Sequence, residues 1–167
     1  GAGGSIGSEL CRQIIKNQPQ KLVIYELTEF ALYSIDKELR LASNIEIIPI
    51  LGTVLDQAKL ERIIEQYAVQ TVYHAAAYKH VPLVECNPLA GLKNNAVGTA
   101  FSVNAAVKKG VETFVLISTD KAVRPTNVMG ASKRMAELYC QAMAEAQQQT
   151  QISIVRFGNV LGSSGSV

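Results

Sequence analysis

Short apolar segments alternate with longer helical segments along the whole chain, and this alternation restricts the folds that the sequence can adopt. The apolar segments are rich in Val, Ile and Leu, as buried strands are, whereas the segments between them have the periodicity of helices. Expected strands are residues 22–25, 46–50, 71–74, 113–117 and 152–156, and expected helices are residues 8–16, 30–41, 55–67, 88–109 and 131–149. Repeated strand–helix alternation favours parallel strands with right-handed crossovers. We therefore predict an α/β fold with a doubly wound parallel sheet.

A glycine-rich segment opens the chain, with a glycine at every third position just before the first expected helix. Glycines let the backbone approach a pyrophosphate closely, and the helix amino terminus supplies free N–H groups. No Lys-Ser or Lys-Thr pair follows at P-loop spacing, which argues against a triphosphate site. We predict a Rossmann-type dinucleotide loop whose cofactor-binding residues are Gly1, Gly4, Ser5, Ile6 and Gly7.

An acidic residue, Glu26, follows the first expected strand at the spacing that a dinucleotide fold requires. Its carboxylate would accept hydrogen bonds from an adenosine ribose and would repel a 2′-phosphate, so NAD is favoured over NADP. Thr28 and Glu29 are expected to share this role. The alternative is that Glu26 is a solvated acid at a strand end.

The chain begins on the first glycine of a loop that normally follows a strand. We therefore expect the first strand of the sheet to be missing and the chain to be part of a longer protein. Its length of 167 residues and its composition predict one NAD-binding domain over residues 1–167. Residues 163–167 are expected to form a loop.

The composition argues against several classes of function. A net charge of +2 without a basic stripe gives no reason to expect nucleic acid as a partner. Cys11, Cys86 and Cys140 lie far apart without histidines at ligand spacing, so we expect free thiols in a reducing cytoplasm and no metal site. Since no apolar run is long enough to cross a bilayer, membrane attachment would need segments outside this chain.

The segment from Ser118 to Lys133 has the properties of an active site. Asp120 and Lys121 lie just after the strand at 113–117, at the sheet edge where ligands bind in open α/β folds. Met129 and Lys133 are one helical turn apart and are expected to face the same way. The alternative is that Asp120 and Lys121 form a solvated pair and that Lys133 is an ordinary surface charge.

Two other strand ends carry candidate ligand contacts. Ala75, Ala76 and Ala77 would let the ribose and nicotinamide lie against the backbone, unless they are simply alanines that begin a helix. Lys79 and His80 follow in a loop and are candidate substrate contacts, although a lone loop histidine is more often structural or merely exposed. Asn159, after the last strand, is a candidate contact for a sugar or phosphate.

These motifs together resemble a known family. The segments that carry the resemblance are residues 1–7, 74–77, 79–82, 87–88, 118–123, 125–127 and 156–160. They are similar to the nucleotide-sugar 4,6-dehydratases of bacterial polysaccharide biosynthesis, the CapD-like extended short-chain dehydrogenases/reductases that include UDP-N-acetylglucosamine 4,6-dehydratases. The resemblance covers nearly the whole chain, and most of the sugar-binding region of such enzymes would follow Val167.

The resemblance implies a redox-neutral reaction on UDP-N-acetylglucosamine or a related UDP-N-acetylhexosamine. Bound NAD takes hydride from C4, water leaves across C5 and C6, and hydride returns to C6 to give a 4-keto-6-deoxy sugar. Lys121 would be the base at C5, Asp120 the acid for the leaving hydroxyl and Thr119 a hydrogen-bond partner of the C4 oxygen. Lys133 would hold the nicotinamide ribose. Acid and base work would require burial and mutual interaction to move the pKa values of Asp120 and Lys121 toward neutrality.

Two residues depart from the family pattern. Met129 stands where most of the superfamily has a tyrosine that accepts the alcohol proton, and a thioether cannot accept it usefully. We read Met129 as the mark of a subgroup in which Asp120 also removes the proton of the C4 hydroxyl. Thr53 stands where related enzymes often have an aspartate that contacts adenine, so backbone groups near Thr53 and Val54 are expected to bind the cofactor.

Two other functions compete with a dehydratase. One is a nucleotide-sugar 4-epimerase or reductase on the same scaffold, although an epimerase has no C5 proton for Lys121 to remove. The other is a non-catalytic NAD-binding module, with Met129 as the sign of lost chemistry. The resemblance further implies a homo-oligomer of the full-length protein and a cytoplasmic location, either free or as the cytoplasmic domain of an inner-membrane protein.

Overall fold

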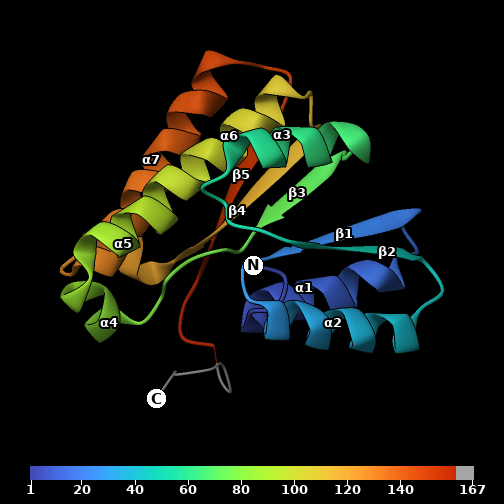
Figure 1. Ribbon diagram of the computed structural model, residues 1–167. Coiled ribbons are helices and arrows are strands. Elements are labelled where there is room, and N and C mark those ends of the chain that lie inside the picture. The colour runs from blue at the N-terminus through green and yellow to red at the C-terminus, as the bar shows by residue number, and fades with distance from the viewer. Residues whose placement is uncertain (161–167) are drawn as a thin grey trace. The chain divides into compact units, whose positions relative to one another are not determined.

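The computed structural model describes residues 1–160 of the 167-residue chain. The chain divides into two compact units, Gly1–Thr53 and Val54–Val167, which are described one at a time. Both units are built from parallel strands and helices (Figure 1), so the predicted α/β class is confirmed. The expected loop at 163–167 lies outside the described residues, and the assignment of one domain to residues 1–167 stays a prediction.

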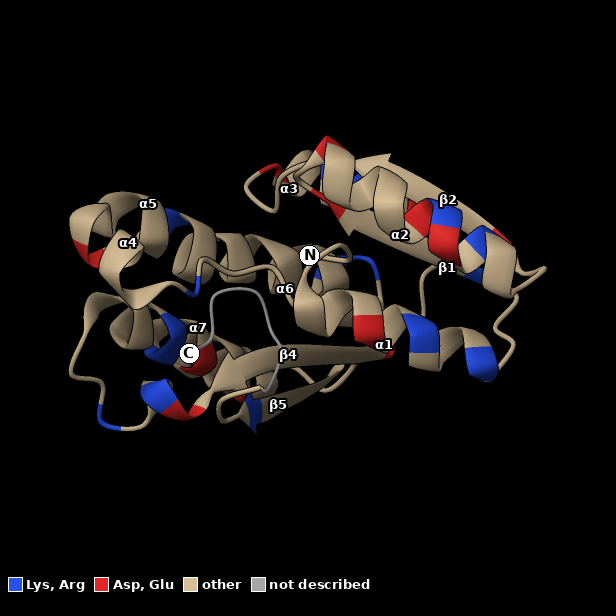
Figure 2. Cartoon of the chain, turned by 90° about the horizontal axis from the view of Figure 1, so that it is seen from below, with Lys and Arg blue, Asp and Glu red and all other residues tan. Residues whose placement is uncertain are grey.

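The N-terminal unit contains two helices and two parallel strands. Its elements are α1 (Ser5–Lys16), β1 (Lys21–Glu26), α2 (Glu29–Ala42) and β2 (Glu46–Leu51). The register pairs Lys21 with Glu46 and Glu26 with Leu51. A core of Cys11, Ile24, Leu32, Ile35, Leu39 and Ile47 joins all four elements. Charged residues lie along α1 and α2 (Figure 2), and Arg12 of α1 binds both carboxylate oxygens of Glu38 of α2.

The C-terminal unit is built around three parallel strands in the order β3-β4-β5. Its elements are α3 (Gln57–Gln66), β3 (Thr71–His74), α4 (Val81–Cys86), α5 (Pro88–Leu92), η1 (Lys93–Val97), α6 (Gly98–Lys108), β4 (Thr113–Thr119), η2 (Asp120–Ala122), α7 (Val128–Ala146) and β5 (Gln151–Phe157). Helix α7 packs on β4 and β5, and α6 packs against α3 and α7.

The core of this unit lies around β4, the strand with a neighbour on each side. Phe114 and Leu116 of β4 are fully buried, together with Val103 of α6 and Ala136 and Cys140 of α7. At the surface, Lys108 and Lys109 form ion pairs with Glu61 and Glu65, which tie the end of α6 to α3. The central strand that carries the expected catalytic residues is therefore fixed by packing on both sides.

Three elements differ from the sequence prediction. The expected helix at 88–109 is interrupted by the π-helical segment η1, which buries the polar side chains of Asn94 and Asn95. Helix α4 lies where the sequence predicted no helix, and its Pro82 is tolerated because it stands in the first turn. Helix α7 begins at Val128, earlier than predicted, because the Asn127 side chain caps its first turn.

Within residues 1–160, no helix combines the length and the apolar character that a membrane span requires.

Candidate active site

Lys133 is the most deeply buried of the charged residues expected at the catalytic site. It lies on α7 with 5% of its surface exposed, and its ammonium group donates a hydrogen bond to the Ile117 carbonyl at 2.7 Å. Loss of hydration lowers the pKa of Lys133 to about 8, although the charge of Glu137 acts in the opposite direction. The interpretation of Lys133 as an ordinary surface charge is therefore wrong.

Met129 and Lys133 share the buried face of α7, as their spacing predicted. Met129 is 3% exposed and lies one turn before the lysine. The same turn contains Gly130, where a Cβ atom would overlap the carbonyl oxygen of Lys121 in η2. Absence of a side chain at Gly130 thus lets the start of α7 approach the backbone that carries Asp120 and Lys121.

Thr119, Asp120, Lys121 and Asn159 form one hydrogen-bonded group beyond the carboxyl ends of β4 and β5. The Thr119 hydroxyl donates to Asp120 Oδ1 at 3.0 Å and accepts from the Lys121 N–H at 3.3 Å. The ammonium of Lys121 lies 3.4 Å from Asp120 Oδ1 and donates to Asn159 Oδ1 at 2.9 Å. The structure thus joins Asn159, predicted only as a sugar or phosphate contact, to the base candidate Lys121.

The condition that burial should move the pKa of Asp120 toward neutrality is not met in the structure. The Asp120 side chain is 57% exposed, and that of Lys121 is 38% exposed. The hydrogen bond from Thr119 lowers the pKa of Asp120, and the neighbouring Lys121 lowers it further, because both stabilise the ionised form. Asp120 is therefore a carboxylate at neutral pH, and the description of Asp120 and Lys121 as a solvated pair holds for the free chain.

A buried carboxylate, Glu137, lies one turn after Lys133 on the same face of α7. It accepts hydrogen bonds from Ser118 of β4, from Arg134 of α7, and from two nitrogens of Arg156 of β5, at 2.7 to 2.9 Å. Burial opposes its ionisation, but the hydrogen bonds from Arg156, Ser118 and Arg134 together lower the pKa of Glu137 to about 2. We call these four residues the Glu137 cluster.

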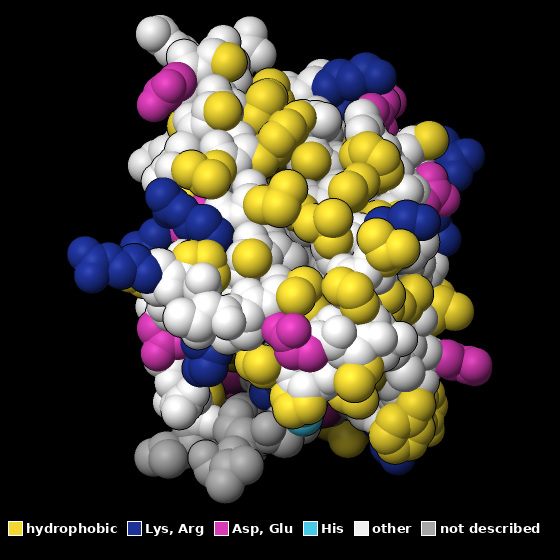
Figure 3. Space-filling model, turned by 90° about the vertical axis from the view of Figure 1, so that its left-hand side faces the viewer, with side chains coloured by type: hydrophobic (Ala, Val, Ile, Leu, Met, Phe, Trp, Pro, Cys, Tyr) yellow, Lys and Arg dark blue, Asp and Glu magenta, His cyan; other side chains and the backbone are white. Residues whose placement is uncertain are grey.

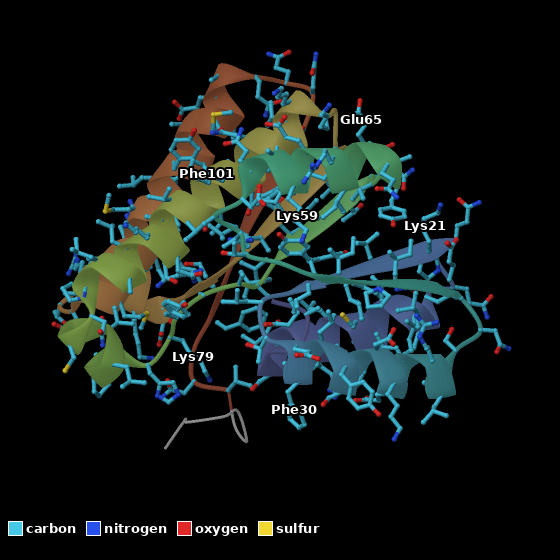
Figure 4. All side chains as sticks on the ribbon, in the orientation of Figure 1. Lys21, Phe30, Lys59, Glu65, Lys79 and Phe101 are labelled. Carbon is cyan, nitrogen blue, oxygen red and sulfur yellow. The ribbon has the colours of Figure 1, made fainter. Side chains whose placement is uncertain are left out.

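The segment between β3 and α4 carries Ala75, Ala76, Ala77, Lys79 and His80, and Figure 4 labels Lys79 on it. The three alanines are not helical, so their interpretation as the start of a helix is wrong. Lys79 and His80 are exposed, and His80 directly precedes α4.

The buried side chain of Asn95 fixes the course of this segment. It accepts from the Tyr78 N–H at 2.7 Å and donates to the Tyr78 carbonyl at 2.9 Å. It also donates to Ser132 Oγ, the neighbour of Lys133 in sequence, at 3.0 Å. Asn95 therefore connects the loop of predicted ligand contacts to the helix that carries Lys133.

His74, at the end of β3, is a neutral buried side chain. Its Nε2 lies 2.9 Å from Thr99 Oγ1, and its ring stacks on Phe114. Burial lowers the pKa of His74 to about 3, and the charge of Lys133 contributes to the shift. His74 is thus a structural residue rather than a source of protons near neutral pH.

In the N-terminal unit, the glycine segment forms the start of α1. Gly4 precedes the helix, and Ser5, Ile6 and Gly7 form its first turn, so their N–H groups lie at the positive end of the helix. A Cβ atom on Gly3 would lie 2.5 Å from Cβ of Ala31 in α2, and one on Gly7 would overlap the Gly1 carbonyl. The segment therefore has the close backbone packing and exposed helix terminus that suit a pyrophosphate.

Glu26 lies beside this glycine segment and is 8% exposed. Its Oε2 accepts from the Gly3 N–H at 3.0 Å, and its Oε1 accepts from the N–H groups of Leu27 and Thr28 at 2.9 and 3.1 Å. The interpretation of Glu26 as a solvated acid is therefore wrong. A carboxylate has about four acceptor positions, so these three bonds leave capacity for a ribose hydroxyl.

The other expected cofactor contacts lie near the ends of β1 and β2 or after them. Thr28 and Glu29 begin α2 and are exposed, and the Thr53 carbonyl accepts a hydrogen bond from the Tyr25 hydroxyl at 2.9 Å. Val54 belongs to the C-terminal unit and is buried, where it would contact a Cβ atom at Gly98.

Sequence reasoning missed Glu137, Asn95 and Ser132. Glu137 had a readable signal, since Met129, Lys133 and Glu137 follow one another at intervals of four and share one helix face. Asn95 had none, because its role depends on a π-helical turn that periodicity does not reveal.

Together, the parallel strands and the helices that cover them define an α/β protein of the Rossmann type. The sequence profile of the polysaccharide biosynthesis protein family matches residues 1–167, and the chain belongs to this family.

Curated relatives include proteins with more than one activity in their names. Capsular polysaccharide biosynthesis protein CapD of Staphylococcus aureus is 47% identical over 100% of this chain and 28% of its own length. An inverting UDP-N-acetylglucosamine 4,6-dehydratase of Campylobacter jejuni is 37% identical over 100% of this chain and 49% of its own length. A UDP-glucose 4-epimerase of Rickettsia canadensis is 33% identical with the same coverage. The chain therefore spans about half or less of these relatives.

Solved structures share the fold. Pen from Bacillus thuringiensis superposes with a TM-score of 0.92 at 30% identity, over 100% of this chain and 52% of that one. A dTDP-glucose 4,6-dehydratase from Streptomyces venezuelae, DesIV, solved with NAD, has a TM-score of 0.80 at 20% identity over 93% of this chain and 53% of that one. At that identity the likeness to DesIV shows the fold alone.

Proposed function

We propose that the full-length protein containing this chain is an NAD-dependent nucleotide-sugar 4,6-dehydratase that acts on UDP-N-acetylglucosamine or a closely related sugar. The observation that carries the proposal is the group formed by Thr119, Asp120, Lys121 and Asn159 at the carboxyl ends of β4 and β5. It offers a carboxylate and an amine side by side, as an elimination that moves two protons requires. The 37% identity with a named dehydratase points the same way.

The cofactor part of the proposal keeps the residues that the sequence predicts, and each unit is considered by itself. Gly1, Gly4, Ser5, Ile6 and Gly7 would hold the pyrophosphate and Glu26 the adenosine ribose, for the geometric reasons given above. Ala75, Ala76, Ala77 and Lys133 would contact the nicotinamide end, with Thr28, Glu29, Thr53 and Val54 around the adenosine. When bound, NAD supplies the oxidation at C4 and the reduction at C6.

Asp120 begins the reaction as a base in this proposal. Because the Thr119 hydrogen bond and Lys121 keep it ionised, its carboxylate can take the proton of the C4 hydroxyl. That role is open because Met129 cannot accept a proton. The same proton is then held on Asp120 and is available for the departing C6 hydroxyl. One carboxylate thus serves both proton transfers.

Lys121 removes the C5 proton. Its Nζ contacts Asn159 Oδ1 and Asp120 Oδ1, so the nitrogen is held between these two side chains. Before it acts as a base, the ammonium releases one proton to solvent, to which its side chain is 38% exposed. The neutral amine then takes the C5 proton and returns it to C5 once hydride has reached C6, so that the protons balance.

The remaining residues orient the sugar. The Thr119 hydroxyl would form a hydrogen bond with the C4 oxygen of the sugar. The positive charge of Lys133, whose ammonium donates to the Ile117 carbonyl, would stabilise negative charge on that oxygen. Lys79, His80 and Asn159 are the proposed contacts to the substrate.

The test is incubation of the full-length protein with NAD and UDP-N-acetylglucosamine, followed by mass spectrometry. A product lighter by one water supports the proposal. An isomer of equal mass would favour the epimerase alternative, which the epimerase relative also suggests, and cofactor binding without turnover would favour a non-catalytic module. In the Asp120→Asn variant we expect no C4 oxidation, so unimpaired NADH formation would refute the role of Asp120.

The proposal includes a homo-oligomer in the cytoplasm. Hydrophobic side chains gather on the face shown in Figure 3, and exposed apolar residues on α4, α5 and α7 include Leu83, Leu89, Met135 and Leu138. Such a surface is suited to association with another subunit. Light scattering of the full-length protein measures its mass directly, and a monomer would contradict this part.

A further inference from the structure

The Glu137 cluster uses a fully buried carboxylate that the proposed chemistry does not require. The Glu137 side chain has no exposed surface, and its hydrogen bonds come from three elements. Ser118 and Arg156 are paired neighbours on β4 and β5, so both reach Glu137 from the strands on which α7 packs. A buried charge with this many partners is costly to disrupt, because each partner would also lose its hydrogen bond.

Each strand of this cluster leads directly into the reactive group. Ser118 immediately precedes Thr119, Asp120 and Lys121, and Arg156 lies three positions before Asn159. The segments that follow β4 and β5 are joined by the hydrogen bond that the Lys121 ammonium donates to Asn159 Oδ1. On the helix side, Glu137 lies one turn from Lys133. Glu137, which shares α7 with Lys133, thus contacts the two strands whose ends lead into Asp120, Lys121 and Asn159.

We propose that Glu137 is a positioning residue: its carboxylate fixes the carboxyl ends of β4 and β5 against α7, so that Asp120, Lys121 and Asn159 are held in place relative to Lys133. This inference rests on the proposed function for its catalytic consequence. Its structural part concerns the mobility of two strand ends and can be measured without turnover.

Glu137 also acts on the charge of Lys133. The groups that face Lys133 electrostatically are Glu137 and Cys140 on its own helix and His74 on β3, which is neutral. Arg134 and Arg156 face Glu137 itself. Since Glu137 raises the pKa of Lys133 against the effect of burial, removal of its charge should lower that pKa.

The first measurement is hydrogen–deuterium exchange of the full-length protein with Glu137→Gln, an almost isosteric change. We expect faster exchange in peptides that cover residues 118–121 and 157–160, and unchanged exchange in residues 21–26 of the N-terminal unit. The control is Glu65→Gln, which breaks an exposed ion pair of the same unit and should leave both peptides unchanged. Unchanged exchange in Glu137→Gln would overturn the inference, whether or not the protein is a dehydratase.

The second measurement is kinetic. Displacement of reacting groups by about 1 Å can lower the reaction rate about 100-fold. We therefore expect kcat of Glu137→Gln to fall by roughly 10- to 100-fold, with little change in KM. The alkaline limb of its pH profile should move to lower pH, which a general loss of stability would not cause. A wild-type protein without dehydratase turnover would sink the proposed function but leave the exchange result standing.

A third variant guards against misfolding of Glu137→Gln. Ser118→Ala removes one hydrogen bond to Glu137 without changing any charge. It should raise exchange at 118–121 alone, lower kcat less than Glu137→Gln does, and leave the pH profile in place. Equal behaviour of Ser118→Ala and the wild type in exchange and in kcat would contradict the positioning role.

Discussion

Replacement of Gly130 by alanine should separate activity from stability, because this glycine touches the backbone of the proposed base. A Cβ atom at position 130 would overlap the Lys121 carbonyl oxygen and lie 3.1 Å from its carbonyl carbon and 3.2 Å from Cβ of Pro125. Ordinary carbon–carbon contacts lie at about 3.5–4.0 Å, so Lys121 must move by about 0.5–1 Å.

The cost to folding is partly offset. Overpacking costs about 1–3 kcal/mol, whereas alanine is favoured over glycine inside a helix by about 1 kcal/mol, which leaves a net loss of about 0–2 kcal/mol. The cost to catalysis has no such offset. A shift of this size in a reacting group can reduce the rate by about 100-fold, equivalent to about 2.7 kcal/mol in the activation barrier.

The assay compares kcat and thermal unfolding of full-length Gly130→Ala with those of Gly158→Ala. Among residues 1–160, a Cβ atom at position 158 would have only Asp120 Oδ2 nearby, at 3.8 Å, which is an ordinary contact. We expect Gly158→Ala to resemble the wild type and Gly130→Ala to lose most activity while it remains folded. A kcat for Gly130→Ala within twofold of the wild type would refute the reasoning.

Three further predictions follow from burial and packing. The pKa of Lys133 falls from 10.5 to about 8 on folding, so between pH 8 and pH 10.5 the unfolded chain binds more protons than the folded chain. The free energy of unfolding of the wild type should therefore rise in this range by about 1.4 kcal/mol per pH unit relative to that of Lys133→Met. Equal pH slopes of the two proteins in chemical denaturation would contradict this. His74, whose pKa is about 3, should remain neutral in NMR titrations from pH 8 to pH 5, and an imidazole shift in that range would count against its burial. Gly3→Ala, whose Cβ would lie 2.5 Å from Cβ of Ala31, should weaken NAD binding and destabilise the N-terminal unit by about 1–3 kcal/mol. Gly4→Ala, whose Cβ has its nearest atom at 3.6 Å, should have a smaller effect on both. Calorimetry with NAD measures the binding and denaturant titration the stability, and equal effects of the two variants would refute the packing argument.

The strands and most helices could be predicted because their signals are local. Val115, Leu116 and Ile117 form an apolar run that is typical of a buried strand of a parallel sheet. The spacing of Met129 and Lys133 predicted that both lie on one face of a helix, and both are buried on α7. The capping role of Asn127 shifted the start of α7 by only one turn. Such features depend on neighbours in sequence, which a single chain reveals.

The polar interior could not be predicted in the same way. Burial of Glu137 depends on Arg156 and Ser118, which are 19 residues away along the chain in opposite directions. The protonation of Asp120 was misjudged because its exposure depends on where the η2 turn places it. Long-range pairing and exposure are properties of the folded chain, so they appear only once the strands are in register.

The hydrogen bonds of Asn95 have a consequence for how such a site can diversify. Asn95 binds the N–H and the carbonyl of Tyr78, not its side chain, and so defines the path of the segment that carries Lys79 and His80 through main-chain atoms alone. The anchorage of the segment thereby uses main-chain atoms of Tyr78. We expect that residues 78–80 can be exchanged for others, to suit another ligand, while the segment keeps its anchorage to the helix that carries Lys133.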